Sequence, residues 1–207
     1  RPTHPTLTPS HPTAIPPTLI DPVQPSPCDA PARPARPLVS RSVAAVSGAG
    51  GEPLAMTVRS GEPADAEGIC ALINHWAQEG LTLRRTLEEV EASVAEFVVA
   101  VVEGRVIACG ALVVFSPALA EIRSVAIAPE AKGFGAGTAV VRFLVEQAET
   151  MSLDRVVLLT KIPAYFAKFG FGEITRHDLP DEFIAEFITA RGRKLEGRSI
   201  MARSLLR

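Results

Sequence analysis

The chain has 207 residues, of which 47% are hydrophobic and 21% are charged, and its formal net charge is −2. This composition is ordinary for a globular protein, and the length allows one domain with a tail. The near-neutral balance argues against a nucleic-acid partner, because no excess of lysine or arginine is available to neutralise phosphates. The longest apolar runs, such as residues 97–102, are far shorter than the roughly 20 residues that a bilayer-spanning helix needs.

The three cysteines, Cys28, Cys70 and Cys109, are scattered along the chain. They are too few for a disulfide framework, and no cluster of His, Cys and carboxylates has the spacing of a metal site. We therefore expect a reducing, cytoplasmic location and no bound metal. Cys109 fits a small core residue better than a nucleophile.

The first 55 residues differ in composition from the rest of the chain. Thirteen of the eighteen prolines lie there, among Ser, Thr, Ala and Arg. Because proline fixes φ and removes a backbone donor, residues 1–55 are predicted to be an extended, disordered extension. Met56 would then be a natural start. A linker or a targeting segment is the alternative for residues 1–55.

From Met56 onward, strand and helix patterns alternate. Pro63 suits the first turn of a helix, and Thr86 with Glu89 forms a capping-box pattern. We predict strands at 57–59, 96–102, 106–115, 119–128, 155–160, 171–174 and 198–206, and helices at 63–78, 86–94, 137–150, 163–169 and 180–192. Strands interrupted by helices indicate a mixed α/β or α+β sheet.

Three glycines, Gly133, Gly135 and Gly137, lie between a predicted strand and a predicted helix in the sequence KGFGAG. Glycine lets the backbone approach a ligand, and the start of a helix favours anions, so such a loop can bind phosphate. The loop lacks the Gly-Lys-Ser/Thr ending of a P-loop and the spacing of a Rossmann fingerprint. A plain turn remains an alternative for the loop on its own.

Residues 125–149, VAIAPEAKGFGAGTAVVRFLVEQAE, resemble motif A of the GNAT acetyltransferases, with Lys132, Gly135 and Gly137 on the glycine-loop pattern. Residues 165–174 resemble the family's motif B, so the resemblance covers nearly all of 56–207. It implies a central mixed, mostly antiparallel sheet of about six to seven strands flanked by helices, with acetyl-CoA as co-substrate. The implied coenzyme-binding residues are Val125, Ala126, Ile127, Lys132, Gly133, Phe134, Gly135, Ala136, Gly137 and Thr138.

Within that family, residues 79–91 and 197–206 resemble segments of N-acetylglutamate synthases. This implies acetylation of the α-amino group of L-glutamate by direct transfer, the first step of arginine biosynthesis. Two carboxylates need cations, preferably arginine. The implied substrate-binding residues are Arg84, Arg85, Lys161, Arg198 and Ser199, although any one of these cations could equally be a solvated surface residue.

The implied catalytic residues are Glu121, Val125 and Tyr165. Glu121 would be the general base, its pKa raised by partial burial, and the backbone N–H near Val125 would hold the oxyanion. An ordinary structural glutamate paired with Arg123 is the alternative for Glu121. The usual proton-donating tyrosine is replaced by Phe166, so Tyr165 and Thr160 are both candidates for the acid.

Two other functions stay open at this point. One is acetylation of a different amine, which an acceptor pocket rich in acids would favour. The other is a non-catalytic acyl-CoA-binding module. The expected partners are a small amino-acid substrate and, through the C-terminal strands, a second copy of the chain.

Overall fold

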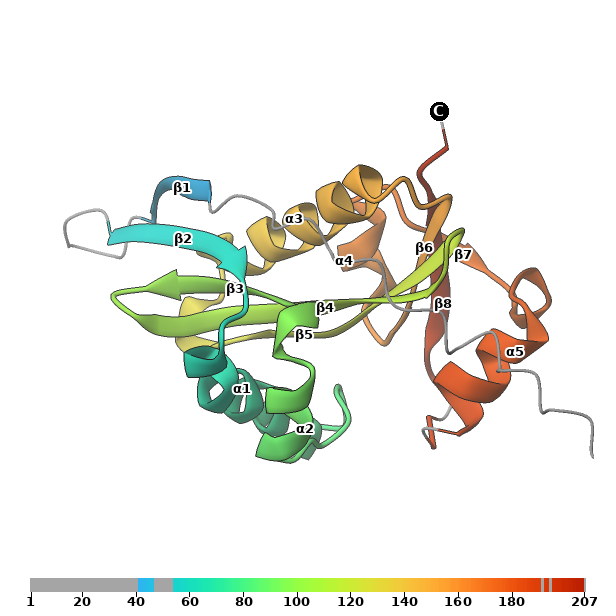
Figure 1. The fold of residues 1–207 in the computed structure, drawn as a ribbon, viewed down its shortest axis with the longest axis horizontal. Helices are drawn as coiled ribbons and strands as arrows, with labels where there is room; N and C mark the ends of the chain where they lie inside the picture. Colours follow the sequence, from blue (N-terminus) through green and yellow to red (C-terminus); the bar gives the residue numbers. More distant parts are fainter. Residues whose placement is uncertain (1–40, 47–53, 191, 194, 207) are drawn as a thin grey trace, which may run out of the picture. The chain divides into compact units, whose positions relative to one another are not determined.

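The computed structural model describes residues 41–46, 54–190, 192–193 and 195–206. Within them lies one eight-stranded sheet of order β1-β2-β3-β4-β5-β6-β8-β7 (Figure 1). Only the pairing of β5 with β6 is parallel, and the other neighbours are antiparallel. The mixed, mostly antiparallel sheet predicted from the sequence is therefore confirmed. Most of the Pro-rich range 1–55, including Cys28, lies outside the described residues.

The elements before the sheet's centre follow the predicted order, except that the unpredicted strand β1 precedes them. They are β1 (Arg41–Val46), β2 (Leu54–Ser60), η2 (Pro63–Asp65), α1 (Ala66–Gln78), α2 (Leu87–Ala92), η3 (Val94–Glu96), β3 (Phe97–Val102) and β4 (Arg105–Ser116). The predicted capping box is present, because Thr86 Oγ1 accepts from Glu89 N–H and Glu89 Oε2 accepts from Thr86 N–H. Glu103 and Gly104 both have positive φ, which makes the tight turn between β3 and β4.

The remaining elements complete the sheet and its second layer. They are β5 (Leu119–Ile127), η4 (Pro129–Ala131), α3 (Ala136–Thr150), β6 (Arg155–Thr160), α4 (Pro163–Ala167), β7 (Gly172–Ile174), η5 (Arg176–Asp178), α5 (Asp181–Phe183), η6 (Ile184–Thr189) and β8 (Ser199–Ser204). The helix predicted at 180–192 is a single α-helical turn followed by the π-helical turn η6.

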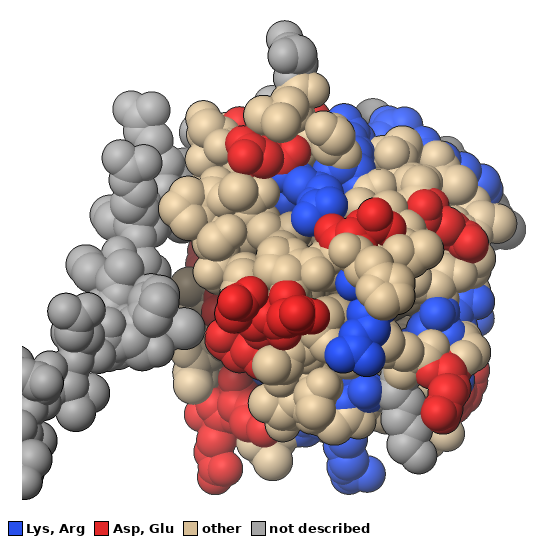
Figure 2. Space-filling model, turned by 90° about the vertical axis from the view of Figure 1, so that its right-hand side faces the viewer, with Lys and Arg blue, Asp and Glu red and all other residues tan. Residues whose placement is uncertain are grey.

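The count of strands differs from the expected six or seven because β1 adds one. It lies inside the range assigned to the extension and pairs antiparallel with β2. The described helices include none that is long and apolar enough to cross a bilayer. Acidic and basic side chains are interspersed on the face drawn in Figure 2. A homodimer and a cytoplasmic location stay predictions.

Helices cover both faces of the sheet (Figure 1). One face packs on α3 and α4 through a core that includes Val140, Leu144 and Phe166. The other face carries two separate clusters, one under α1 around Ile73 and one under α5 and η6 around Phe183. The two clusters on this second face leave a stretch of β5 between them, and that stretch contains the charged residues of the candidate site.

Two irregularities open the sheet at β5. The ladder between β5 and β6 ends at the pair Glu121–Val157, so the two strands separate beyond it. On the other side of β5, the register with β4 shifts between Arg123 and Ala126, and Ser124 takes a φ of 55°. This bulge leaves part of the β5 backbone without ladder partners, next to the gap between the strands.

Candidate active site

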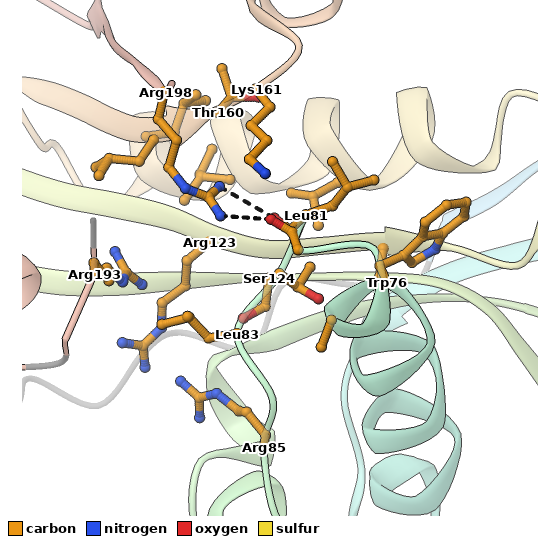
Figure 3. A pocket seen from close by; sticks show the side chains of 18 of the residues that line it. Trp76, Leu81, Leu83, Arg85, Arg123, Ser124, Thr160, Lys161, Arg193 and Arg198 are labelled. Carbon is orange, nitrogen blue, oxygen red and sulfur yellow. Dashed lines mark hydrogen bonds between the residues drawn. The ribbon is translucent and has the colours of Figure 1, made fainter. Parts of the chain in front are cut away.

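A cavity of about 1330 Å³ occupies the opening between β5 and β6 (Figure 3). Its lining comes from seven parts of the chain: the end of α1 with the loop to α2, α2, β5, Lys132 before α3, the end of β6, α4, and the segment before β8. Because residues from both layers of helices line it, the cavity connects the α3 face of the sheet with the α1 face. Ligands can therefore meet from the two sides at the bulge.

The glycine loop forms the turn before α3, and its glycines have two different structural roles. Gly133 and Gly135 have φ values of 87° and 79°, a left-handed conformation that other residues rarely adopt. Gly137 instead sits in close packing, because a Cβ there would lie 2.3 Å from Ile127 Cδ1 and 2.9 Å from the Tyr165 hydroxyl. The free N–H groups of the first turn of α3 point out of this loop, which suits an anion.

Trp76 and Lys132 form the rim of the cavity near this loop. The Trp76 indole N–H donates to the Ile127 carbonyl at 2.8 Å, which ties α1 to β5. Lys132 Nζ lies 4.4 Å from the centre of the Trp76 ring, a cation–π contact. Both residues line the cavity. Lys132 was predicted from the sequence as a coenzyme-binding residue. Trp76 was predicted to be a core residue instead, because it lies on the apolar stripe of α1.

The bulge at the centre of the cavity is supported from the core. Cys109 is fully buried and its thiol donates to the Ser124 carbonyl at 3.7 Å. Burial raises the pKa of the Cys109 thiol to about 12, against a smaller opposing effect of a backbone hydrogen bond at Ala126. Cys109 is not among the lining residues, whereas Val125 is. This agrees with the prediction that Cys109 is a core residue.

Glu121 is 1% exposed and forms an ion pair with Arg193. The sequence-based alternative, a pair between Glu121 and Arg123, is wrong. Arg123 pairs with Glu96 instead, at 3.1 Å, because its side chain extends across the sheet toward the start of β3. Arg123 and Arg193 both line the cavity, and sequence reasoning proposed neither as a site residue. Alternation along β5 could have revealed Arg123, while no motif marks Arg193.

Four of the five predicted substrate-binding residues line the one cavity: Arg84, Arg85, Lys161 and Arg198. The exception is Ser199, whose hydroxyl donates to Glu173 at 2.9 Å. Asn74 fixes the backbone of Arg85, accepting from its N–H at 2.9 Å and donating to its carbonyl at 2.8 Å. The loop that carries Arg84 and Arg85 is thus attached to α1.

Arg198 attaches the same loop to the other wall. Its guanidinium donates to the carbonyls of Gly80 at 3.0 Å and Leu81 at 3.3 Å (Figure 3). Burial lowers the pKa of Arg198, and the nearby positive charge of Arg193 lowers it further. The effect of Arg193 reflects two cations close together, and this part of the cavity therefore favours an anion.

The two candidate acids lie at the edge of the cavity. Burial raises the pKa of the Tyr165 hydroxyl, and the nearby Thr138 side chain opposes part of that rise. The hydroxyl is buried and makes no hydrogen bond within the described residues. Thr160 Oγ1 accepts from Ile162 N–H at 3.0 Å, so it is engaged in the turn that follows β6. The described residues contain no group of three or more His, Cys, Asp and Glu side chains able to hold a metal.

The family model described as "Acetyltransferase (GNAT) family" matches residues 66–171, which include α1, the bulge, the glycine loop and α4. The chain belongs to the GNAT family of acetyltransferases. As a GNAT enzyme it is an acetyl-CoA-dependent N-acetyltransferase, and the resemblance inferred from the glycine loop is confirmed.

Two curated relatives are similar over most of their length. An uncharacterised N-acetyltransferase of Chlorobaculum tepidum is 34% identical over 60% of this chain and 81% of its own. The amino-acid acetyltransferase of Mycobacterium tuberculosis is 38% identical over 56% of this chain and 68% of its own. The amino-acid acetyltransferase of Aeromonas salmonicida is 33% identical, but the match spans only 27% of that longer protein.

Solved structures give the same family. Rv2747 from Mycobacterium tuberculosis, in complex with CoA and a ligand designated NLQ, superposes with a TM-score of 0.66 at 32% identity over 72% of this chain and 99% of its own. The N-acetylglutamate synthase of Neisseria gonorrhoeae, complexed with coenzyme A and N-acetyl-glutamate, has a TM-score of 0.66 at 26% identity over 73% of this chain and 35% of its own.

The residues present fit the coenzyme that the GNAT family uses. A Cβ at Gly133 or Gly135 would meet nothing within 4 Å, so the loop leaves open space in front of its backbone. Of the predicted coenzyme-binding residues, Val125, Ala126, Ile127 and Lys132 line the cavity, whereas Gly133 to Thr138 do not. The cavity runs from Lys132 along β5 to the bulge at Ser124 and Val125. A nucleotide-bearing thioester can therefore reach the centre of the sheet while an acceptor enters from the side of Arg85.

Proposed function

We propose that this GNAT enzyme acetylates the α-amino group of L-glutamate. The observation that carries the proposal is the charge of the cavity. Three acidic side chains line it, Glu89, Glu121 and Glu196, against seven cationic ones: Arg84, Arg85, Arg123, Lys132, Lys161, Arg193 and Arg198. Such an excess favours an acceptor with negative charge, since arginine forks match carboxylates in geometry and charge.

Similar proteins support the same acceptor class. The Mycobacterium tuberculosis relative is named an amino-acid acetyltransferase, and the Neisseria gonorrhoeae neighbour is an N-acetylglutamate synthase solved with N-acetyl-glutamate. An acceptor pocket rich in acids, which would have favoured a polyamine, is not what the described lining offers. Among amino acids, an acceptor with two carboxylates can pair with more of these cations than an acceptor with one.

The coenzyme part of the proposal rests on backbone groups. N–H groups from Gly133 to Thr138 would hold the pyrophosphate, Lys132 would add one charge, and the β5 backbone at Val125, Ala126 and Ile127 would run beside the pantetheine arm. When bound, acetyl-CoA supplies an activated acetyl group. The Ile127 carbonyl already accepts a hydrogen bond from the Trp76 indole, so the N–H donors of β5 are more available to the coenzyme than this carbonyl.

The chemical roles fall on the centre of the cavity. Glu121 would take the proton of the acceptor ammonium, directly or through a water, with Arg193 orienting its carboxylate. The Val125 N–H, freed from the ladder by the bulge, would donate to the oxyanion. Tyr165 would supply a proton to the departing thiolate; Thr160 is less suited because an aliphatic hydroxyl is a much weaker acid than a phenol.

The acceptor's carboxylates would be held by Arg84, Arg85, Lys161 and Arg198. Arg85 is the strongest of these, because Asn74 fixes its backbone while its side chain remains in the cavity (Figure 3). Ser199 lies next to Arg198 on β8, but its hydroxyl is bonded to Glu173, so it would support the site indirectly.

The test is free-thiol release from acetyl-CoA by the full chain with L-glutamate, beside L-glutamine, L-aspartate and a polyamine. We expect turnover to be highest with L-glutamate. Arg85→Ala should raise the KM for glutamate about tenfold, and Glu121→Gln should lower kcat by about 100-fold. Turnover with the polyamine alone would contradict the glutamate proposal but keep the GNAT assignment. Unchanged kcat in Glu121→Gln would remove the base role.

A further inference from the structure

Arg123 is the most deeply buried of the cationic side chains around the cavity. Its residue is 8% exposed, and its side chain 7%. It lines the cavity, and Figure 3 shows it between Arg193 and Arg85. Burying a guanidinium is costly unless its donors are satisfied and its charge is paired. The state of its hydrogen bonds therefore indicates what the site is built to receive.

Only part of the Arg123 guanidinium is satisfied by the described residues. Nη2 donates to Glu96 Oε2 at 3.1 Å, whereas Nε and Nη1 are buried and have no hydrogen-bond partner there. Glu96 is not among the lining residues, so it anchors the side chain without filling the cavity. These unsatisfied donors suit anionic oxygens, and either of them can form a fork with the second N–H of Nη2, a geometry that binds a carboxylate strongly.

The direction of the side chain indicates which anionic group that is. Phe97, Ala111 and Arg123 lie opposite one another on β3, β4 and β5. Since Glu96 directly precedes Phe97, Arg123 reaches across β4 to meet it, away from the opening between β5 and β6. A thioester at the bulge and the acceptor amine that attacks it stay at the opening. The α-carboxylate stays there too, because the same carbon carries it and the amine.

We propose that Arg123, with Arg85 facing it from the α1–α2 loop, binds the side-chain carboxylate of the acceptor and so selects acidic amino acids. The inference rests on the proposed function, because it assigns the second carboxylate of the same acceptor. Lys161 and Arg198 lie on the opposite wall in Figure 3 and are left for the α-carboxylate. Arg123 is therefore a specificity-determining residue, distinct from the predicted base Glu121.

The first measurement compares L-glutamate with L-norvaline, which has a similar length but no side-chain carboxylate, in the full chain. We expect Arg123→Gln to lower kcat/KM for L-glutamate by about 50-fold and that for L-norvaline by less than about threefold. Arg123→Lys, which keeps the charge but loses the fork, should give an intermediate loss. Arg142→Gln, an exposed arginine on α3, is the matched control and should match the unsubstituted chain.

An unchanged KM for acetyl-CoA and retained norvaline turnover would show that Arg123→Gln still folds. Equal losses with both acceptors would overturn the inference, because Arg123 would then be structural or would bind the α-carboxylate. An unchanged kcat/KM for L-glutamate would overturn it as well.

Binding of glutarate separates this inference from the glutamate proposal. Glutarate carries two carboxylates and no amine, so calorimetry in the presence of CoA reports the anion site without turnover. We expect Arg123→Gln to weaken glutarate binding at least tenfold and leave binding of valerate, the monocarboxylate control, unchanged. That result without any glutamate turnover would refute the proposed acceptor and keep the role of Arg123. Equal glutarate binding by both forms would refute the role of Arg123 alone.

Discussion

The proposed coenzyme end of the site is mainly backbone from one continuous segment, residues 132–138, of which Lys132 lines the cavity. The proposed acceptor end consists of side chains from separate segments. The coenzyme end depends on glycine conformations and on the start of α3. The acceptor end depends on arginines and a lysine from the α1–α2 loop, from β5, from the end of β6 and from the segment around β8. Few substitutions preserve the backbone shape on which the coenzyme end depends. At the acceptor end, by contrast, a single side-chain substitution can change which ligand binds.

The largest effect should come from disturbing the backbone end. Gly137→Val would place a Cβ 2.3 Å from Ile127 Cδ1 and 2.9 Å from the Tyr165 hydroxyl, and its γ-carbons would push the first turn of α3 away from β5. Because small displacements of bound groups are costly, we expect kcat/KM for acetyl-CoA to fall by about 100-fold. The Kd of CoA, measured by calorimetry, should rise in parallel.

Gly172→Val is the matched control for Gly137→Val. A Cβ at Gly172 would meet nothing within 4 Å, and the residue lies in β7, where valine is well suited. Its kinetics should match those of the unsubstituted chain. CoA affinity that is equal in Gly137→Val and the unsubstituted chain would show that the close packing at Gly137 is irrelevant to the coenzyme site.

A smaller and more selective effect is expected at the acceptor end. Arg198→Gln removes the two hydrogen bonds to Gly80 and Leu81 that attach the α1–α2 loop to the segment before β8. The KM for the acceptor should rise about tenfold, since each hydrogen bond from a charged donor contributes roughly 1.5 kcal/mol or more. The KM for acetyl-CoA should not change. Hydrogen exchange should become faster in residues 79–86.

Arg176→Gln, an exposed arginine in η5, controls for loss of one positive charge. If Arg198→Gln raised both KM values equally, the two ends of the cavity would be coupled and the contrast between them would fail.

This contrast also explains what could be predicted from the sequence. The order of strands and helices, the capping box at Thr86 and the glycine loop depend on residues close together in the chain, and all are present in the structure. The predicted coenzyme loop could be named residue by residue for the same reason. Other residue types rarely adopt the backbone conformation of Gly133 and Gly135. The spacing of glycines in the sequence therefore predicts the conformation of the loop.

The acceptor end could be predicted only in part. Arg85 was found through a family resemblance, but the ion pairs of Glu121 with Arg193 and of Arg123 with Glu96 join residues 72 and 27 positions apart. No periodicity encodes such pairs, because they depend on how the bulge and the sheet register aim the side chains. The eighth strand, β1, was missed because proline-rich composition dominated its surroundings.

Tyr165 lies where the two ends meet, and its loss should have a modest effect. Because burial raises its pKa above the ordinary value of about 10, the hydroxyl stays protonated between about pH 6 and pH 9. Tyr165→Phe should therefore lower kcat about fivefold by the same factor at each pH in that range. A ratio of the two kcat values that changes with pH would show that Tyr165 ionises during turnover.

The smallest effect is expected at Cys109, which supports the bulge from the side of the core. Its thiol is fully buried and has a pKa of about 12, so almost no thiolate is present at neutral pH. Cys109→Ala loses the weak hydrogen bond to the Ser124 carbonyl but leaves the β5 backbone in its register with β4. We expect kcat to change by less than about twofold and intact-protein mass spectrometry to find no acetyl adduct on Cys109. An acetylated Cys109 that forms and decays at the rate of turnover would instead require a covalent route, and the bulge would then position a nucleophile rather than an oxyanion donor.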